Sequence, residues 1–390
     1  MDSTFECIVA AGVLKSIESP ASNAFEALQV FQEQSRDWIF GHLAYDLKNQ
    51  TEDLTSANND EVNFPDLFFF VPQVVIILSD KEIEIGVTTN TSKAIYASIM
   101  SSPSTHYPVE QENIKSTTLK SRYTRNEYIQ TVQQLKAHIL RGECYEINFC
   151  QEFYLDDYSS DPIVTFQKLQ NISPNPFGAL YRLNDRYCIC ASPERFLKKK
   201  ATRLFSQPIK GTAPRVRDNG LLDLESRNSL SHPKERSENV MIVDLVRNDL
   251  AKVCKEGSVL VDELCGVYSF PQVHQMISTI SGKVDNDFPI DKILKATFPM
   301  ASMTGAPKLN VLKLVEKYER TRRGLFSGSI GYITPGNDFD FNVVIRSILY
   351  NSTVKYLSIQ AGSAITFESD PEMEYEECLL KISALQKILA

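Results

Sequence analysis

The pattern of apolar and polar residues between positions 124 and 153 predicts a helix followed by a strand. Thr124 and Glu127 have the spacing of a capping box, and Gly142 is placed to end the helix. Apolar residues recur on one helical face: Tyr128, Val132, Leu135 and Ile139. From residue 145 the period changes to two, with Tyr145, Ile147, Phe149 and Phe153 alternating with Glu146, Asn148 and Cys150. A strand with so regular a polar face either meets solvent or lines a site.

The first 118 residues alternate short apolar runs with polar breaks. Residues 38–46 predict a buried strand ending in a turn, 48–63 a loop, and 67–78 a strand. The polar, proline-bearing segment 101–121 predicts a long loop or linker.

Two later helices each begin with a pair of glutamates three residues apart. Glu235 and Glu238 follow Pro233, and Glu374 and Glu377 follow Pro371. Acidic residues near a helix N-terminus are favoured by the helix dipole, so either pair alone fits a solvated face. Together they supply what a hard divalent cation requires, namely a few carboxylates with positions left for water and an anionic ligand.

Composition and charge narrow the class of protein. The chain of 390 residues has a net charge of −8 and no run of Lys or Arg, which argues against nucleic acid as the partner. No apolar run reaches membrane-spanning length, and the acidic N-terminus does not resemble a secretory signal. Eight cysteines without a C-x-x-C pair favour a reducing cytoplasm and no zinc site.

The segment 206–217 carries the strongest candidate for a nucleophile, Lys210. Gly211 and Thr212, which follow it, let the backbone approach a ligand closely. In a half-buried turn the pKa of a lysine falls from about 10.4 toward roughly 7–8, where the free amine is a nucleophile. The alternative is a surface lysine after a strand.

Two further features suggest an anion site. The small residues Gly362, Ser363 and Ala364 fit a turn whose backbone N–H groups bind a carboxylate, although small residues also pack well in tight turns. Arg346 stands in an otherwise apolar strand, where a bound carboxylate is a natural partner.

Six motifs follow one another in order: SPERF (192–196), PIKGTAPR (208–215), KERSENVMIVDLVRNDL (234–250), GAPK (305–308), RRG…GSIGY (322–332) and SDPEMEYEE (369–377). With this set the chain resembles the chorismate-utilising enzymes, which include anthranilate synthase component I, isochorismate synthase, salicylate synthase and aminodeoxychorismate synthase component I. The resemblance is strong over 123–385 and faint before it.

The resemblance implies an α+β fold in which two large antiparallel β-sheets pack as a sandwich with helices outside. It implies a chorismate-binding catalytic domain over 119–390, with 1–118 as an N-terminal region of the same sandwich. It also implies Mg²⁺ between the enzyme and a chorismate carboxylate, with Glu238 and Glu377 as ligands and Glu235 and Glu374 as their outer-shell companions.

Other residues receive roles from the same resemblance. Glu194 matches the general acid for departure of the ring C4 hydroxyl. Substrate-contacting positions fall on Glu146, Gly211, Thr212, His274, Thr304, Arg346, Gly362, Ser363 and Ala364. Without this resemblance, His274 would be a lone histidine, and such residues are more often structural.

Lys210 points to one branch of the family. Anthranilate and isochorismate synthases usually have alanine there, whereas the lysine form is similar to aminodeoxychorismate synthase component I, where the amine attacks the ring before ammonia displaces it. Glu146 differs from both the water-activating lysine of isochorismate synthases and the usual glutamine of ammonia users. Further departures are Ser363-Ala364 in place of two glycines and Phe326 in place of a tyrosine.

No glutaminase motif is present, so we expect ammonia to arrive free or from a separate glutamine amidotransferase subunit. Three alternatives remain open: an anthranilate synthase component I, an isochorismate synthase, and a non-catalytic chorismate-binding homologue.

Overall fold

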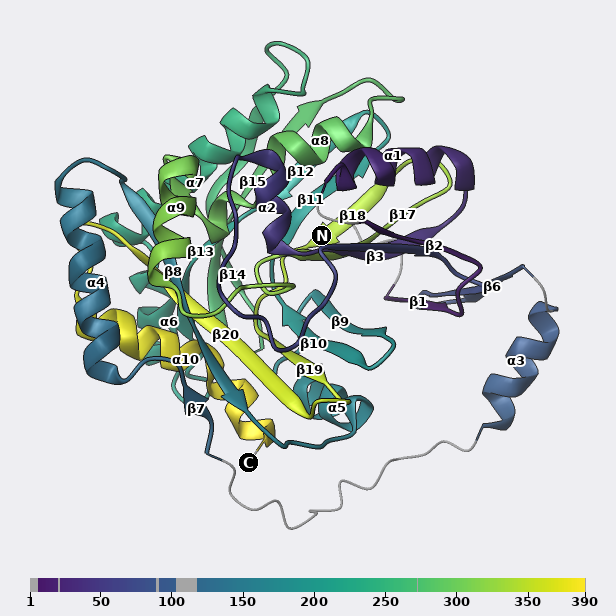
Figure 1. Ribbon diagram of the computed structural model, residues 1–390, viewed down its shortest axis with the longest axis horizontal. Helices are drawn as coiled ribbons and strands as arrows, with labels where there is room; N and C mark the ends of the chain where they lie inside the picture. Colours follow the sequence, from purple (N-terminus) through teal and green to yellow (C-terminus); the bar gives the residue numbers. More distant parts are fainter. Residues whose placement is uncertain (1–5, 20–21, 89–90, 103–117, 272, 390) are drawn as a thin grey trace.

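Two large antiparallel sheets form the centre of this α+β fold, and a small third sheet lies at one side (Figure 1). The structure is a computed structural model that describes residues 6–19, 22–88, 91–102, 118–271 and 273–389. The fold class and the two large sheets are as the resemblance implied. The third sheet, of three strands, was not expected.

The seven-stranded sheet has the order β16 (Gly305–Ala306), β8 (Glu146–Leu155), β20 (Tyr356–Ile365), β19 (Ser347–Asn351), β10 (Arg186–Ser192) and β9 (Phe177–Leu183), with β7 (Lys120–Ser121) also paired to β8. The ten-stranded sheet has the order β13 (Ile209–Pro214), β15 (Val273–Lys283), β12 (Arg203–Gln207), β11 (Arg195–Lys200), β18 (Phe339–Asn342), β17 (Ser329–Ile333), β3 (Ile39–Leu43), β4 (Leu67–Val71) and β2 (Lys15–Ser19), with β14 (Leu260–Ser269) paired to β15. The small sheet has the order β1 (Cys7–Ala11), β5 (Val74–Leu78) and β6 (Ile83–Val87).

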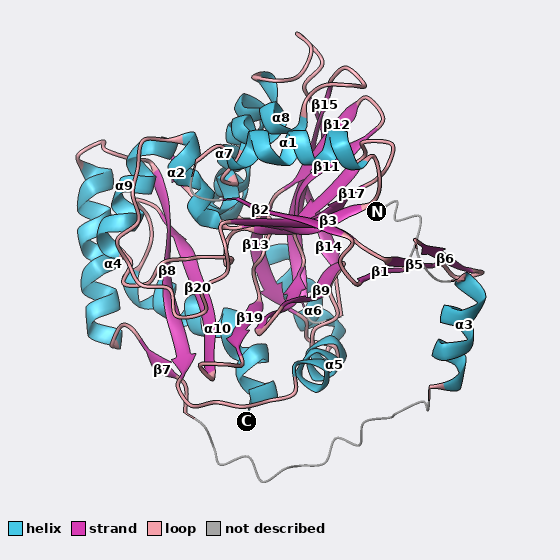
Figure 2. Ribbon diagram, turned by 45° about the vertical axis from the view of Figure 1, so that its right-hand side comes forward, coloured by secondary structure: helices cyan, strands magenta, loops and turns pink. Residues whose placement is uncertain are grey.

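The helices lie around these sheets (Figure 2). They are α1 (Ala24–Ser35), α2 (Lys48–Thr51), α3 (Ser92–Ser101), α4 (Arg125–Leu140), α5 (Pro162–Ile172), α6 (Gly220–Ser229), α7 (Pro233–Ala251), α8 (Ile290–Thr297), α9 (Lys308–Tyr318) and α10 (Pro371–Leu389), with short 3₁₀ turns η1 (Tyr45–Leu47) and η2 (Ala301–Met303).

Strand β8 lies between two hydrophobic cores, and its side chains alternate between the two faces with the predicted period of two. Ile147, Phe149 and Phe153 pack into the core that the seven-stranded sheet shares with α4, α9 and α10. Cys150, on the other face, belongs to a core with side chains from both large sheets and from α1, α7 and α8. The polar residues Glu146 and Asn148 of this second face are buried rather than solvated.

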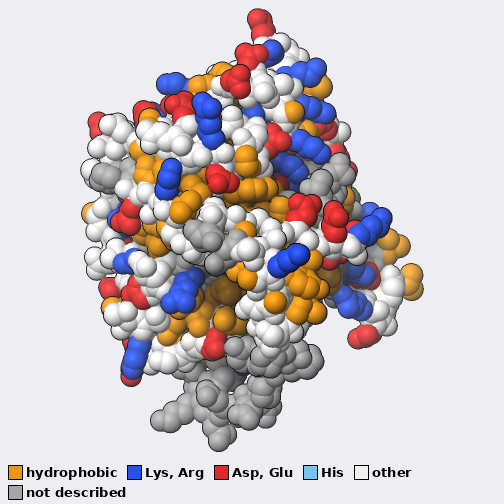
Figure 3. Space-filling model, turned by 90° about the vertical axis from the view of Figure 1, so that its right-hand side faces the viewer, with side chains coloured by type: hydrophobic (Ala, Val, Ile, Leu, Met, Phe, Trp, Pro, Cys, Tyr) orange, Lys and Arg blue, Asp and Glu red, His pale blue; other side chains and the backbone are white. Residues whose placement is uncertain are grey.

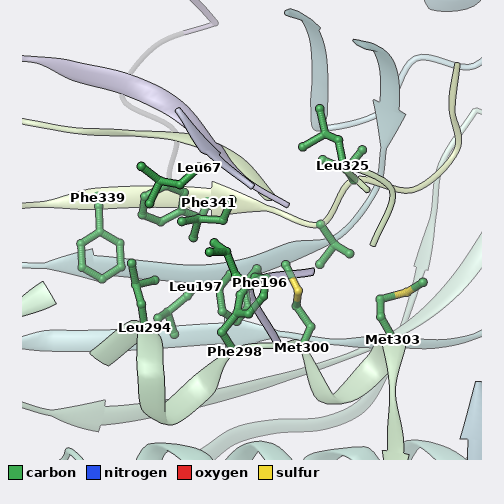
Figure 4. Packing of buried hydrophobic residues seen from close by; sticks show 14 of the residues in the cluster. Leu67, Phe196, Leu197, Leu294, Phe298, Met300, Met303, Leu325, Phe339 and Phe341 are labelled. Carbon is green, nitrogen blue, oxygen red and sulfur yellow. The ribbon is translucent and has the colours of Figure 1, made fainter. Parts of the chain in front are cut away.

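Residues just after Glu194 are anchored in the core between the sheets. Figure 4 shows Phe196 beside Phe298, and their ring centroids are 6.1 Å apart in an edge-to-face arrangement. Such aromatic pairs contribute about 0.5–1.5 kcal/mol beyond their buried area. The turn that carries Glu194 therefore has a rigid support.

The sequence predicted helix α4 correctly. Thr124 and Glu127 form the complete capping box, and the apolar face is buried. The single strand expected over 67–78 is wrong, because Pro72 lacks the N–H that would continue the ladder. The chain there divides into β4, in the ten-stranded sheet, and β5, in the small sheet.

Strands β2, β3 and β4 from the N-terminal region extend the ten-stranded sheet beyond β17. This region thus shares a sheet and a core with the rest of the chain. Most of the expected linker 101–121 lies outside the described residues.

The surface mixes both charges. On the face in Figure 3, acidic and basic side chains are interspersed, and the basic ones form no continuous stripe. No helix in the described ranges combines the length and the apolar character needed to cross a membrane. All eight cysteines lie in the described part and are free thiols.

Candidate active site

A cavity of about 210 Å³ gathers most of the predicted site residues. Its walls come from β13 of one large sheet, β8 and β20 of the other, the turn η2, and helices α7 and α10. The predicted residues that line it are Glu194, Lys210, Gly211, Thr212, Glu235, Glu238, Arg346, Gly362, Ala364, Glu374 and Glu377. A larger surface groove, of about 1090 Å³, on another face of α7 contains none of the predicted residues.

Four predicted residues do not line the cavity: Glu146, His274, Thr304 and Ser363. The ring nitrogens of His274 lie 2.8 Å from Ser269 Oγ and 3.1 Å from Asp223 Oδ1. The Thr304 hydroxyl donates to the carbonyl oxygen of Met300 at 3.0 Å. In this structure these two side chains therefore support the surrounding elements rather than contact a ligand in the cavity.

Lys210 is buried and ion-paired. Its Nζ donates to Glu146 Oε1 at 2.8 Å, and its exposed fraction is only 9%. Burial by itself lowers the pKa of Lys210, but the carboxylates of Glu146, Glu238 and Glu194 outweigh burial and raise this pKa above its ordinary value. The sequence prediction of a lowered pKa is therefore wrong, because a turn motif does not reveal which carboxylates the fold places around the amine.

Glu194 occupies the turn between β10 and β11 with an exposed fraction of 3%. Its backbone N–H donates to Ser192 Oγ at 3.2 Å, which fixes the turn. Burial raises the pKa of Glu194 to about 7, although Ser302 and Lys210 favour the charged form. A carboxyl group with a pKa of about 7 is about half protonated at neutral pH, so a substantial fraction of Glu194 is able to donate a proton.

The two glutamate pairs face the same cavity from two helices. Burial raises the pKa of Glu238 to about 7, and burial together with the charges of Glu377 and Glu374 raises the pKa of Glu235. Glu377, by contrast, has a lowered pKa, because Lys381 lies 2.7 Å from its Oε1. A divalent cation would neutralise the negative charges that these glutamates bring to one site. Mg²⁺ suits such a site because it prefers carboxylate oxygens as ligands.

The four glutamates are not, however, arranged as a closed cage. No group of three or more His, Cys, Asp or Glu side chains in the described part of the chain is close enough to hold a metal ion. Such an open arrangement is compatible with a cation that keeps water or substrate oxygens as further ligands.

Arg346 supplies a cationic group at the cavity. It lies between β18 and β19 in a left-handed backbone conformation, with φ of 53°. Burial lowers the pKa of Arg346, opposed by the charge of Glu377. Within the described ranges its guanidinium has no hydrogen bond and no ion pair, and Arg346 is one of the residues that line the cavity.

The predicted turn at Gly362, Ser363 and Ala364 is wrong. These residues lie inside strand β20 and pair regularly with Cys150, Phe149 and Asn148 of β8. A Cβ at residue 362 would lie 2.0 Å from the carbonyl oxygen of Phe149, so glycine is required by the close approach of two strands. Alternation places Gly362 and Ala364 at the cavity and Ser363 on the opposite face.

The structure adds cavity residues that sequence reasoning missed: Asn148, Lys234, Gln275, Ser302 and Lys381. Lys381 had a signal, because it follows Glu377 by one helical turn. It also donates to the carbonyl oxygen of Gly362 at 2.7 Å, which links α10 to β20. Gln275 and Ser302 carry no comparable signal, since their neighbours come from distant segments.

Comparisons with known proteins identify the family to which the chain belongs. Residues 5–387 match the family described as chorismate binding enzyme. The chain is 32% identical over 346 residues to aminodeoxychorismate synthase component 1 of Salmonella typhimurium, covering 88% of this chain and 75% of that protein. It is 31% identical over 380 residues to anthranilate synthase component 1 of Buchnera aphidicola, covering 92% and 72%.

The fold has a solved counterpart in anthranilate synthase component I of Streptococcus pneumoniae, with a TM-score of 0.81 and 23% identity over 99% of this chain and 93% of that one. The match to the family extends over nearly the whole chain, and the cavity holds most of the residues that the motifs singled out. This protein therefore belongs to the chorismate binding enzyme family and is an enzyme that uses chorismate.

Proposed function

We propose that this enzyme aminates chorismate at ring C4 with ammonia to give 4-amino-4-deoxychorismate, the precursor of 4-aminobenzoate and folate. This is the reaction of aminodeoxychorismate synthase component 1. The observation that carries the proposal is Lys210 itself, a buried amine at the cavity wall beside Glu194, at the position where the other branches usually have alanine.

Lys210 and Glu194 have complementary roles in this reaction. The Lys210 amine attacks ring C2 while the C4 hydroxyl leaves, and Glu194 donates the proton that makes the hydroxyl a water molecule. Ammonia then forms its bond to C4 and displaces the lysine. Covalent capture replaces one difficult displacement with two easier ones.

Mg²⁺ would be held by Glu238 and Glu377, with Glu235 and Glu374 behind them. The cation supplies positive charge that neutralises a chorismate carboxylate. Arg346 is suited to hold a substrate carboxylate, because its unpaired guanidinium offers a planar set of donors. Gly211, Gly362 and Ala364 line the cavity with no side chain larger than a methyl group.

Ammonia is supplied by a separate glutamine amidotransferase subunit in this proposal. The relatives named component 1 imply a second component, and the sequence contains no glutaminase motif. The test below uses an ammonium salt in place of this subunit.

The alternatives make different products from the same substrate. The identities to the Salmonella and Buchnera relatives, 32% and 31%, do not by themselves separate the two branches. An anthranilate synthase releases anthranilate, and an isochorismate synthase releases isochorismate with water alone. A non-catalytic homologue binds chorismate and leaves it unchanged.

Mass analysis of the products from chorismate, Mg²⁺ and an ammonium salt tests the proposal. We expect 4-amino-4-deoxychorismate as the product when ammonium is present. When ammonium is left out, we expect that no isochorismate forms. Anthranilate or isochorismate as the main product would contradict the assignment. Binding of chorismate without any turnover would establish the non-catalytic alternative instead.

A further inference from the structure

Glu146 and Lys210 form a buried ion pair that joins the two large sheets. Glu146 begins β8 of the seven-stranded sheet, and Lys210 lies in β13 at the end of the ten-stranded sheet. Glu146 is only 1% exposed, and its Oε1 lies 2.8 Å from Lys210 Nζ. Its Oε2 is buried and has no hydrogen-bond partner in the described part of the chain.

The surroundings of Lys210 keep its nitrogen protonated. Negative charge faces it from β8 through Glu146, from α7 through Glu238 and from the β10–β11 turn through Glu194. Further carboxylates that interact electrostatically with Lys210 are Glu235 of α7 and Glu377 of α10. Other cations at the same cavity are Arg346, between β18 and β19, Lys234 of α7 and Lys381 of α10. An ammonium nitrogen has no free electron pair, so nucleophilic attack requires that one proton be removed first.

Geometry selects one carboxylate as the acceptor of this proton. A proton acceptor has to lie within about 2.6–3.2 Å of the donor atom, and Glu146 meets this condition. Lys210 has no ion pair within 4.0 Å to Glu194 or Glu238, as far as the described residues show. Glu194 also serves as the acid in the proposed reaction and must keep its own proton until the hydroxyl leaves.

We propose that Glu146 is the proton acceptor that converts the Lys210 ammonium into the reactive amine. This inference rests on the proposed function, because it concerns the covalent step of that reaction. It also gives a reason for glutamate at a position where ammonia-using relatives usually have glutamine.

The step balances within the site. One Nζ–H bond breaks, its proton moves to Glu146 Oε1, and the freed electron pair forms the bond to ring C2. The C4–O bond breaks at the same time and takes the proton of Glu194, so that water leaves. When ammonia bonds to C4, Nζ departs with the electrons of the C2–N bond and recovers its proton from Glu146. The new ammonium group at C4 returns one proton to Glu194.

A distinct pH dependence follows. In the wild-type enzyme the proton stays within the ion pair, so the reactive amine forms without loss of a proton to solvent. In Glu146→Gln the amide oxygen still accepts a hydrogen bond from Lys210, but the amide does not take up the proton. The lysine must then release its proton to solvent, and adduct formation becomes slower at low pH.

The test measures the rate of adduct formation on the Lys210 peptide by rapid quench and mass analysis, with chorismate and Mg²⁺ present and ammonium withheld. Wild type, Glu146→Gln and Glu146→Asp are compared at several pH values from acid to alkaline. We expect Glu146→Gln to be slower by about 10²-fold or more near neutrality and to recover as the pH rises. Glu146→Asp should restore part of the rate, because it restores a base.

The outcomes separate the two proposals. Adduct formation in Glu146→Gln at the wild-type rate and with the wild-type pH profile would overturn the role of Glu146 alone. Absence of an adduct in the wild-type enzyme would overturn the covalent function. Melting temperature and chorismate affinity show whether a variant is folded. If Glu146→Gln does not fold, the pH profile of Glu146→Asp decides. If Glu146 is the base, the shorter Asp side chain displaces the carboxylate and should slow adduct formation; if Glu146 has no such role, the rate should not change.

Discussion

Arg323 and Glu319, four residues apart in the segment after α9, form a buried two-point ion pair. Nε donates to Oε2 at 2.9 Å, and one terminal nitrogen donates to Oε1 at 2.6 Å. The same guanidinium donates to the carbonyl oxygens of Met303 and Asn148, at 2.7 and 2.8 Å. Both of these residues line the cavity, so the pair fixes part of its wall from behind.

Breaking this pair should destabilise the protein. Arg323→Leu leaves Glu319 as an uncompensated buried charge, and we expect a loss of about 3–5 kcal/mol in the free energy of unfolding. Urea denaturation measures it. Asp157→Asn is the matched control, because the exposed Lys355–Asp157 pair should contribute no more than about 1 kcal/mol. A loss in Arg323→Leu no larger than in this control would contradict the structural role.

Glu194→Gln should reduce kcat by about 10²–10⁴ with little change in chorismate binding, since it removes the acid and keeps the shape of the side chain. In the wild type, kcat should fall as the pH rises above about 7, because Glu194 then loses its proton. Steady-state kinetics across pH measure both effects. A loss confined to KM would make Glu194 a binding residue.

The raised pKa of Glu194 also makes the stability of the protein depend on pH. Because the pKa of Glu194 is raised from 4.5 to about 7 in the folded protein, the folded state holds more protons than the unfolded state between these values. Its contribution to stability therefore falls as the pH rises through this window. Glu194→Gln should raise the melting temperature relative to wild type more at pH 8 than at pH 5. Equal shifts at both pH values would argue against the raised pKa.

Glu238→Gln and Glu377→Gln should each abolish turnover while the protein stays folded, if Mg²⁺ is held by these two carboxylates. Activity over a Mg²⁺ titration and the melting temperature are the measurements. Glu376→Gln is the control, since this residue is on the same helix but faces solvent. Near-normal activity of either variant at moderate Mg²⁺ would remove the assignment.

Lys210→Ala should lose most amination, and any remaining turnover should shift toward direct attack on the ring, as in the alanine-bearing relatives. Lys210→Ala also leaves the buried Glu146 carboxylate without its cation. Lys210→Arg is therefore measured as a second variant, because it keeps the positive charge and removes the nucleophilic amine. Product analysis and chorismate affinity are measured for both. Formation of 4-amino-4-deoxychorismate at the wild-type rate by either variant would end the covalent proposal.

The sequence by itself determined those features that depend on neighbours along the chain. Thr124 and Glu127 cap α4 through a local motif, and the alternation along β8 assigned its faces, because both depend on spacing within one element. The motifs also identified the family, and most of the site residues predicted from the sequence line the cavity.

Only the tertiary structure decided how these residues act on one another. Glu146 and Lys210 are 64 positions apart, so no local pattern revealed that they pair or that the pairing raises the pKa of the lysine. Gly362 resembled a turn residue, yet it lies within β20, because the approach of β8 requires a residue without a side chain. Charge and burial are properties of assembled neighbours, and these neighbours come together only when the two sheets pack.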